Sequence, residues 1–115
     1  MRIVLMDERP TSWNQFYAGQ HWSKRVQMAK DKHWLIRTAL DPSIQPFTEP
    51  VDITITAYFK NKPLDADNIC AKLYIDGLCG RVLEDDSPKW VRSVTTSSML
   101  TYGDCFVEIY IEPVT

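Results

Sequence analysis

The stretch Val51–Phe59 alternates strictly between apolar and polar residues, and this pattern constrains the fold more than any other in the chain. Every second residue is apolar, and the residues between them are Asp, Thr or Tyr. A period of two predicts a β-strand with one buried and one solvent-facing side. Lys60–Pro63 breaks the alternation and ends the strand. The chain is therefore expected to fold around a β-sheet.

An amphipathic helix is predicted before this strand, from Trp22 to Leu40. Apolar residues and His33 recur there at spacings of four and three, which places them on one side of a helix. Ser23 is the expected N-cap, and His33 is expected to be a hydrogen-bonded core residue. Trp34 and Leu35 fall beside the stripe, where exposed apolar side chains hint at a subunit contact.

The remaining elements predict a mixed sheet with helices packed on it. A second helix should run from about Asn68 to Leu78, with Asp65 or Asp67 as N-cap. Strands are expected at Arg2–Met6, Trp90–Thr96 and Cys105–Ile111, and the last two should pair as an antiparallel hairpin. The predicted fold class is α/β (α+β), a small mixed sheet of four to five strands packed with two helices.

Length and composition fit a single soluble domain spanning residues 1–115. Apolar residues make up 44% and charged residues 24%, and no stretch is long and apolar enough for a transmembrane helix. The apolar run Ile3–Met6 is too short for a signal-peptide core, so a cytoplasmic location is expected. The three cysteines lack metal-site spacing and are expected to be reduced thiols.

The segment Pro10–His21 has neither a helical nor a strand period, and it combines aromatic rings with amides and hydroxyls. One interpretation is a packed loop that Trp13, Phe16 and Tyr17 pin to the core. The other is a substrate-contacting loop, whose rings stack on bases or sugars.

Charge is distributed unevenly along the chain, although the net charge is only −2. Residues 1–40 carry seven Lys or Arg and three acids, whereas residues 41–115 carry six basic and twelve acidic residues. Six of those acids lie between Asp65 and Asp86. The pattern is compatible with a basic arm beside an acidic centre that binds a cation, or with ordinary solvated surfaces.

Two acidic groups flank the second predicted helix. Asp65 and Asp67 precede it, and Asp85 and Asp86 follow it. Residues i and i+2 of an extended segment point the same way, and neighbouring carboxylates are costly without a cation. A site with only oxygen ligands suits Mg²⁺ or Mn²⁺, which can activate water and stabilise a leaving oxygen. Lys72 would then stabilise negative charge in phosphodiester hydrolysis.

The same residues also have a purely structural interpretation. An Asp-x-Asp before a helix often serves as a cap, and two aspartates before Ser-Pro often form a turn. Lys72 and Asp76 are four residues apart on the predicted helix and can form a surface ion pair.

The stretch from Pro63 to Ser87 resembles the RusA family of Holliday junction resolvases, and the N-terminal segments Pro10–Asn14 and His21–Arg25 resemble those of phage-type members. The shared features are D-x-D-N at Asp65–Asn68, a helical lysine at Lys72, D-x-L-x-G at Asp76–Gly80 and an acidic turn at Asp85–Ser87.

This resemblance implies a small α/β homodimer that cuts four-way DNA junctions in recombination and repair, in a bacterial cell or as a phage protein in the host cytoplasm. By position, Asp65, Asp67 and Asp86 would bind Mg²⁺ or Mn²⁺, and Lys72 would be the essential lysine. Asn68 and Asp85 would support the ligands without touching the metal, with Asn68 alternatively starting the helix.

Two positions depart from the family pattern. Lys72 follows Asn68 by four residues, where the family lysine follows by three, and Pro88 replaces a glutamine. On a helix the two lysine positions differ by about 100° but flank the same face.

For a four-way junction as substrate, symmetry separately predicts a dimer, because two matched incisions need two sites and one chain has room for one.

The sequence thus predicts a metal-dependent, structure-selective endodeoxyribonuclease acting on branched DNA. An alternative is a branched-DNA-binding protein with a degenerate active site, and a third interpretation is a structural domain whose acids are caps and turns. The residues expected to contact the DNA backbone are Lys24, Arg25, Lys30, Lys32, Lys60, Lys62, Lys89 and Arg92.

Overall fold

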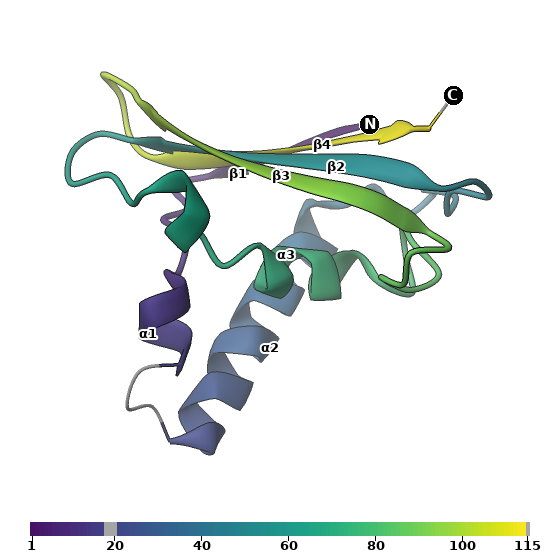
Figure 1. Cartoon of the computed structure of the whole chain (residues 1–115), viewed down its shortest axis with the longest axis horizontal. Coiled ribbons are helices and arrows are strands. Elements are labelled where there is room, and N and C mark those ends of the chain that lie inside the picture. Colours follow the sequence, from purple (N-terminus) through teal and green to yellow (C-terminus); the bar gives the residue numbers. More distant parts are fainter. Residues whose placement is uncertain (18–20, 115) are drawn as a thin grey trace.

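A computed structural model describes residues 1–17 and 21–114, which form a four-stranded mixed sheet with helices on one side (Figure 1). The predicted α+β class is confirmed, with three α-helices in place of the expected two. Among the described residues no helix is long and apolar enough to cross a membrane. The elements are β1 (Arg2–Met6), α1 (Trp13–Tyr17), α2 (Trp22–Ala39), β2 (Val51–Phe59), the 3₁₀ turn η1 (Ala66–Asn68), α3 (Ala71–Leu78), β3 (Val91–Leu100) and β4 (Phe106–Pro113).

The strand predicted from the alternating pattern, β2, lies inside the sheet, whose order is β1-β4-β2-β3. It pairs antiparallel with β4 and parallel with β3, so that Ile55 lies between Ile109 and Thr96. The predicted hairpin of β3 with β4 is therefore wrong, because β2 lies between them. The inward side chains of β2 are completely buried and need a neighbour at each edge, whereas the Ser- and Thr-rich β3 tolerates an outer position.

The hydrophobic core lies between the sheet and the helices α2 and α3. The five inward-facing residues of β2 have no exposed surface. Ile36 from α2, Leu40 just after it, and Tyr74, Ile75 and Leu78 from α3 belong to the same core cluster. Each large apolar side chain buried in this way contributes about 1.5–3 kcal/mol, so this layer supplies most of the hydrophobic stabilisation.

A short helix, α1, lies where the sequence predicts a loop from Pro10 to His21. The hydroxyl of Ser12 accepts a hydrogen bond from the backbone N–H of Gln15 at 2.9 Å, and Gln15 Oε1 accepts from the Ser12 N–H at 3.0 Å. This reciprocal pair is a capping box, which satisfies two backbone donors at a helix start. Residues 18–20 of the predicted loop lie outside the described part of the chain.

α2 begins at Trp22 as predicted, but its capping residue differs, and α3 begins later than predicted. His21 caps α2 in place of Ser23, because its Nδ1 accepts from the Ser23 N–H at 3.2 Å. The second predicted helix, α3, begins at Ala71 and not at Asn68, which ends η1. Ile69 has an extended backbone, with φ −78° and ψ 122°, so the helix cannot run on from Asn68. The N–H of Cys70 donates at 3.0 Å to the Thr11 carbonyl in the segment before α1.

The sheet and α3 cover α2 only in part. Ile36 is buried, but Trp22 and Val26 are 63% and 39% exposed. His33, predicted to lie in the core, is also exposed, so that prediction is wrong. Figure 1 shows the reason: the N-terminal half of α2 extends away from the sheet, so its apolar stripe has no sheet to pack against there.

Candidate functional site

The helix α3 exposes a narrow polar face formed by Lys72 and Asp76, with Cys79 just beyond its end. Residues at this spacing share one side of a helix, and most of the other residues of α3 are buried. Lys72 Nζ lies 3.4 Å from Asp76 Oδ2, which is the ion pair considered from the sequence. An exposed pair of this kind contributes only about 0.3–0.5 kcal/mol, so Lys72 can exchange this partner for another anion.

A close helix crossing fixes the position of this face. A Cβ atom added at Gly77 would lie 2.9 Å from both Cβ and Cγ1 of Ile36 in α2. Arg37 of α2 also donates from Nε to the Gly77 carbonyl at 3.3 Å and from Nη2 to the Cys79 carbonyl at 2.9 Å. Those carbonyls have no acceptor role within the helix, so Arg37 caps the C-terminal end of α3.

Asp65 and Asp67 lie at the other end of α3, on a turn held against β3. The Leu64 carbonyl accepts from Ser98 Oγ at 2.5 Å, and the Ala66 carbonyl accepts from Thr96 Oγ1 at 2.7 Å. Both carboxylates are exposed. Asp65 precedes η1, and its side chain makes no capping hydrogen bond. The backbone of this acidic pair is therefore anchored while its carboxylates face solvent.

Asp85 and Asp86 lie in the turn between α3 and β3, beside the C-terminal end of α3. Asp85 Oδ1 accepts from the Ser87 N–H at 2.8 Å, and hydrogen bonds from Ser87 hold the pKa of Asp85 below its usual value. Burial raises the pKa of the Cys79 thiol, and the carboxylate of Asp86 raises it further. Asp86 therefore follows the C-terminal end of α3, whereas Asp65 and Asp67 precede the start of this helix.

The three predicted metal ligands are not assembled in one chain. Within residues 1–17 and 21–114 there is no group of three or more His, Cys, Asp or Glu side chains that could hold a metal ion. The carboxylates of Asp65, Asp67 and Asp86 have the donor chemistry that Mg²⁺ prefers, but their placement does not fit a common cation. The eight residues of α3, about 12 Å long, separate the two acidic groups.

The parallel pairing of β2 with β3 explains this separation. Val51 pairs with Val91, so β3 must start beside the beginning of β2. The turn that carries Asp86 directly precedes β3 and lies at that end of the sheet. The turn that carries Asp65 follows β2 and contacts the later part of β3. The chain from Asp65 through α3 to Asp86 therefore does not return to its starting point. It ends at the opposite end of the sheet, where β3 begins.

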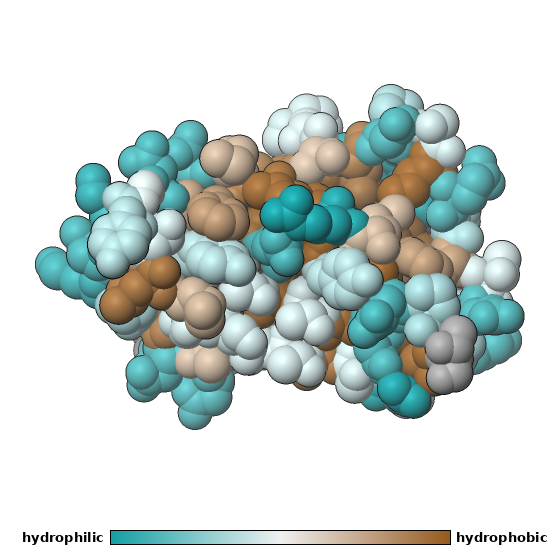
Figure 2. All heavy atoms as spheres, turned by 90° about the horizontal axis from the view of Figure 1, so that it is seen from above, coloured by the Kyte–Doolittle hydropathy of each residue, from teal (hydrophilic) through white to brown (hydrophobic). Residues whose placement is uncertain are grey.

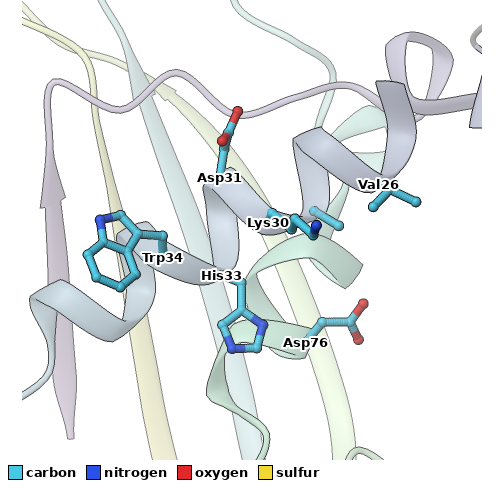
Figure 3. Close-up of a pocket in the computed structure, with 7 residues that line it drawn as sticks. Val26, Lys30, Asp31, His33, Trp34 and Asp76 are labelled. Atoms are coloured by element: carbon cyan, nitrogen blue, oxygen red, sulfur yellow. The ribbon is translucent and has the colours of Figure 1, made fainter. Parts of the chain in front are cut away.

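A groove between α2 and α3 adjoins the polar face of α3. It has a volume of about 710 Å³, and Figure 3 shows Lys30, His33 and Trp34 along α2 with Asp76 on the neighbouring helix. Trp34 is 72% exposed, as its position beside the stripe predicts. The sequence interpretation did not include His33 or Asp76 in a site, although the spacing of residues 30, 33 and 34 puts them on neighbouring parts of one helix surface.

Lys32 belongs to a buried cluster with Glu8 and Tyr74. Its ammonium forms an ion pair with Glu8, and the two side chains are only 14% and 11% exposed. Tyr74 Oη donates to the same carboxylate at 2.6 Å. Burial and the charge of Glu8 raise the pKa of Tyr74 well above its usual value. This cluster joins the segment after β1 to α2 and α3, so Lys32 is poorly placed to contact a phosphate.

The other basic residues predicted to contact DNA are distributed over several elements. Arg92 forms two hydrogen bonds with the carboxylate of Asp52, at 3.0 and 2.5 Å. The ammonium of Lys89 lies 5.4 Å from the centre of the Trp90 ring. Arg25 is half-buried, with its guanidinium 5.8 Å from the Tyr17 ring. The exposed lysines are Lys24 and Lys30 on α2, Lys60 and Lys62 after β2, and Lys89 before β3.

Of the aromatic residues of α1, one is buried in the core and another is exposed to solvent. Phe16 is buried and shares a small core cluster with Cys70 and Leu73. Trp13 stacks on Tyr17 with ring centres 5.6 Å apart, and Tyr17 remains 52% exposed. Phe16 thus follows the packed-loop interpretation, while the exposed ring of Tyr17 is accessible to a ligand.

Comparisons with known proteins give no match: no protein-family model matches the chain, and no curated protein does.

Proposed function

We propose that this chain is a metal-dependent endodeoxyribonuclease that resolves four-way DNA junctions. The proposal rests on the exposed pair Asp65 and Asp67, which occupies an anchored turn before α3, and on Lys72 in the first turn of that helix. Exposed carboxylates and a weakly paired lysine suit the hydrolysis of a phosphodiester, which requires a cation and a positive group for the charge that develops. Its place of action would be the cytoplasm of a bacterial cell, for a cellular or a phage protein.

Each residue of the proposed site has a distinct role. Asp65, Asp67 and Asp86 would hold Mg²⁺ or Mn²⁺, which when bound supplies an activated water and stabilises the leaving oxygen. Lys72 would leave Asp76 to contact the scissile phosphate. Asn68 would fix the turn at the start of the helix, and its N–H already donates to the Asp65 carbonyl at 2.9 Å. Asp85 would hold the turn that carries Asp86 through its hydrogen bond to Ser87.

The placement of Asp86 sets a condition on this proposal. Because Asp86 lies at the far end of α3, a site with three carboxylates requires either that the turn before β3 moves or that a second copy supplies a ligand. The proposed protein is a homodimer, since resolving a junction needs two incisions related by two-fold symmetry. The two sources of the third carboxylate can be separated experimentally.

The activity is tested on a synthetic four-way DNA junction with Mg²⁺, with Mn²⁺ or with EDTA. We expect paired incisions that require the metal and that Asp67→Asn abolishes. Asp104→Asn is the matched control, because Asp104 is an exposed aspartate in the loop between β3 and β4, which carries none of the proposed site residues. The absence of incision by the wild-type protein with either metal refutes the nuclease proposal.

Mixing two inactive variants locates the third carboxylate. In a site shared between copies, an Asp67→Asn chain paired with an Asp86→Asn chain leaves one intact site of two. The mixture therefore regains single-strand nicking, and with random pairing it binds Mn²⁺ at about a quarter of the wild-type stoichiometry. In a site formed within one chain, every site of the mixed dimer carries a substitution, so the mixture stays inactive. Mn²⁺ binding measured by electron paramagnetic resonance gives the readout without DNA.

A branched-DNA-binding protein without catalysis is the second candidate. The observation in its favour is that the described residues contain no group of three side chains that could hold a metal ion. Lys72 also lies one residue later than the lysine of the family pattern. It predicts selective binding of the four-way junction over duplex DNA, equal with Mg²⁺ and with EDTA, and no incision.

A further inference from the structure

The strand β3 forms an unpaired edge of the sheet. Its only partner strand within the described residues is β2. It is ten residues long, and the four residues from Arg92 to Thr95 are exposed, as are Met99 and Leu100. An edge strand of this length presents a row of free N–H and C=O groups to another strand. The other edge, β1, has only five residues.

The sequence of β3 lacks the usual protection of an edge. It contains no Pro and no Lys, and its single charged residue, Arg92, is neutralised by Asp52 of β2. The register with β2 is continuous from Ser93 to Leu100, and the only irregularity lies at the start of the pair. A long edge of continuous register, with β-branched and hydroxyl residues and little charge, is well suited to pair with a further strand.

We propose that β3 pairs antiparallel with β3 of a second copy, across a two-fold axis at Ser97, to form one continuous eight-stranded sheet. This register sets Val94 opposite Leu100 of the second copy, and Thr96 opposite Ser98. Val94 and Leu100 are 41% and 69% exposed and lie on the helix side of the sheet, so each covers apolar surface of the other. The strand is thus complementary to itself, and this favours a second copy over a foreign strand.

The uncovered face of the sheet is consistent with this arrangement. All helices lie on one side, so a two-fold axis perpendicular to the sheet keeps both helical layers on that side (Figure 1). Figure 2 looks onto the opposite face, where apolar and neutral surface surrounds a hydrophilic group in the middle and further hydrophilic groups lie toward the two ends. The turns of both copies that bind Thr96 and Ser98 would lie on either side of the axis, with Asp65 and Asp67 exposed beside it.

The interface is tested by charge substitutions at the axis. Ser97→Lys and Ser97→Glu each place two like charges opposite one another, so each should weaken dimerisation at least about tenfold. A mixture of the two variants should restore the dimer. Thr56→Lys is the matched control, because Thr56 is the neighbour of Ser97 on β2, on the same face but away from the edge. Light scattering after size-exclusion chromatography measures the mass, and circular dichroism checks the fold.

A cysteine at the axis tests the register independently. Ser97→Cys should form a disulfide with its own copy under mild oxidation, whereas Thr95→Cys, opposite Met99, should not. The inference is overturned by a wild-type protein that stays monomeric at high micromolar concentration, or by a dimer that both Ser97 charge variants leave intact. It does not depend on nuclease activity: a chain that dimerises through β3 and cuts no DNA supports it and refutes only the proposed function.

Discussion

Replacing Gly77 by alanine should destabilise the protein through the contact between α2 and α3. The new Cβ would lie 2.9 Å from two atoms of Ile36 and 3.3 Å from the backbone Cα of His33. Ile36 has no exposed surface, so its side chain cannot turn away into solvent. Overpacking of a tight core contact costs about 1–3 kcal/mol, and two contacts below 3.0 Å place this site in the upper half of that range.

The gain in helix propensity only partly offsets this cost. Alanine is favoured over glycine inside a helix by about 1 kcal/mol, so the expected net loss in the free energy of unfolding is about 1–2 kcal/mol. For a domain of this size the loss lowers Tm by roughly 4–8 °C. Urea titration followed by circular dichroism measures the free energy, and thermal denaturation measures Tm.

Two further variants distinguish the helix contact from a general effect of the substitution. Gly103→Ala is the matched control, because nothing lies within 4 Å of the added Cβ, and its change should stay within about 0.5 kcal/mol. Combining Gly77→Ala with Ile36→Ala removes the Cγ1 contact, so the double variant should lose less stability than the sum of the single losses. A Gly77→Ala protein as stable as the wild type refutes the reasoning.

Three other predictions concern the same layer. Arg37→Met should destabilise by about 1–2 kcal/mol in urea titration, because two carbonyls at the end of α3 lose a charged donor; an unchanged midpoint contradicts the capping role. The pKa of Tyr74 is raised in the fold by burial and by Glu8, so its contribution is complete below the unfolded pKa of about 10 and is lost as pH rises further. Tyr74→Phe should therefore remove part of the drop in Tm above pH 10, and an identical alkaline profile contradicts this. Ser12→Ala breaks the capping box and should cost about 1 kcal/mol by thermal denaturation; an unchanged Tm shows that the box is dispensable.

Features of the fold that depend on neighbouring residues could be predicted from the sequence, whereas features that depend on contacts between distant segments could not. The burial of β2 is predictable because alternation is a local property, and all five of its inward residues are buried. The partners of β2 depend on contacts between distant segments, which is why the hairpin of β3 and β4 was wrong. The sequence of Ser12–Gln15 contains the capping-box pattern that would have revealed α1.

The candidate site also combines local features, which the sequence predicts, with long-range features, which it does not. The ion pair of Lys72 with Asp76, one of the interpretations drawn from the sequence, is present because residues four apart share one side of a helix. The distance between Asp65 and Asp86 depends on the direction of β3 in the sheet, which the local pattern does not contain. His33 was predicted to be in the core because its spacing fits the stripe, but α2 is longer than the layer that covers it.

The pairing of β1 with β4 has a consequence for how the chain folds during synthesis. Arg2 pairs with Tyr110, and the terminal amino group donates to the Ile111 carbonyl at 2.7 Å. The sheet therefore cannot close until β4 has left the ribosome, and β2 must wait with one apolar edge unpaired. Since Met1 lies against β4, a short linker from the end of β4 to Met1 could join them, and a circular permutant opened at the loop before β4 would make β4 and β1 contiguous. Such a permutant should fold faster than the natural order while keeping the same sheet.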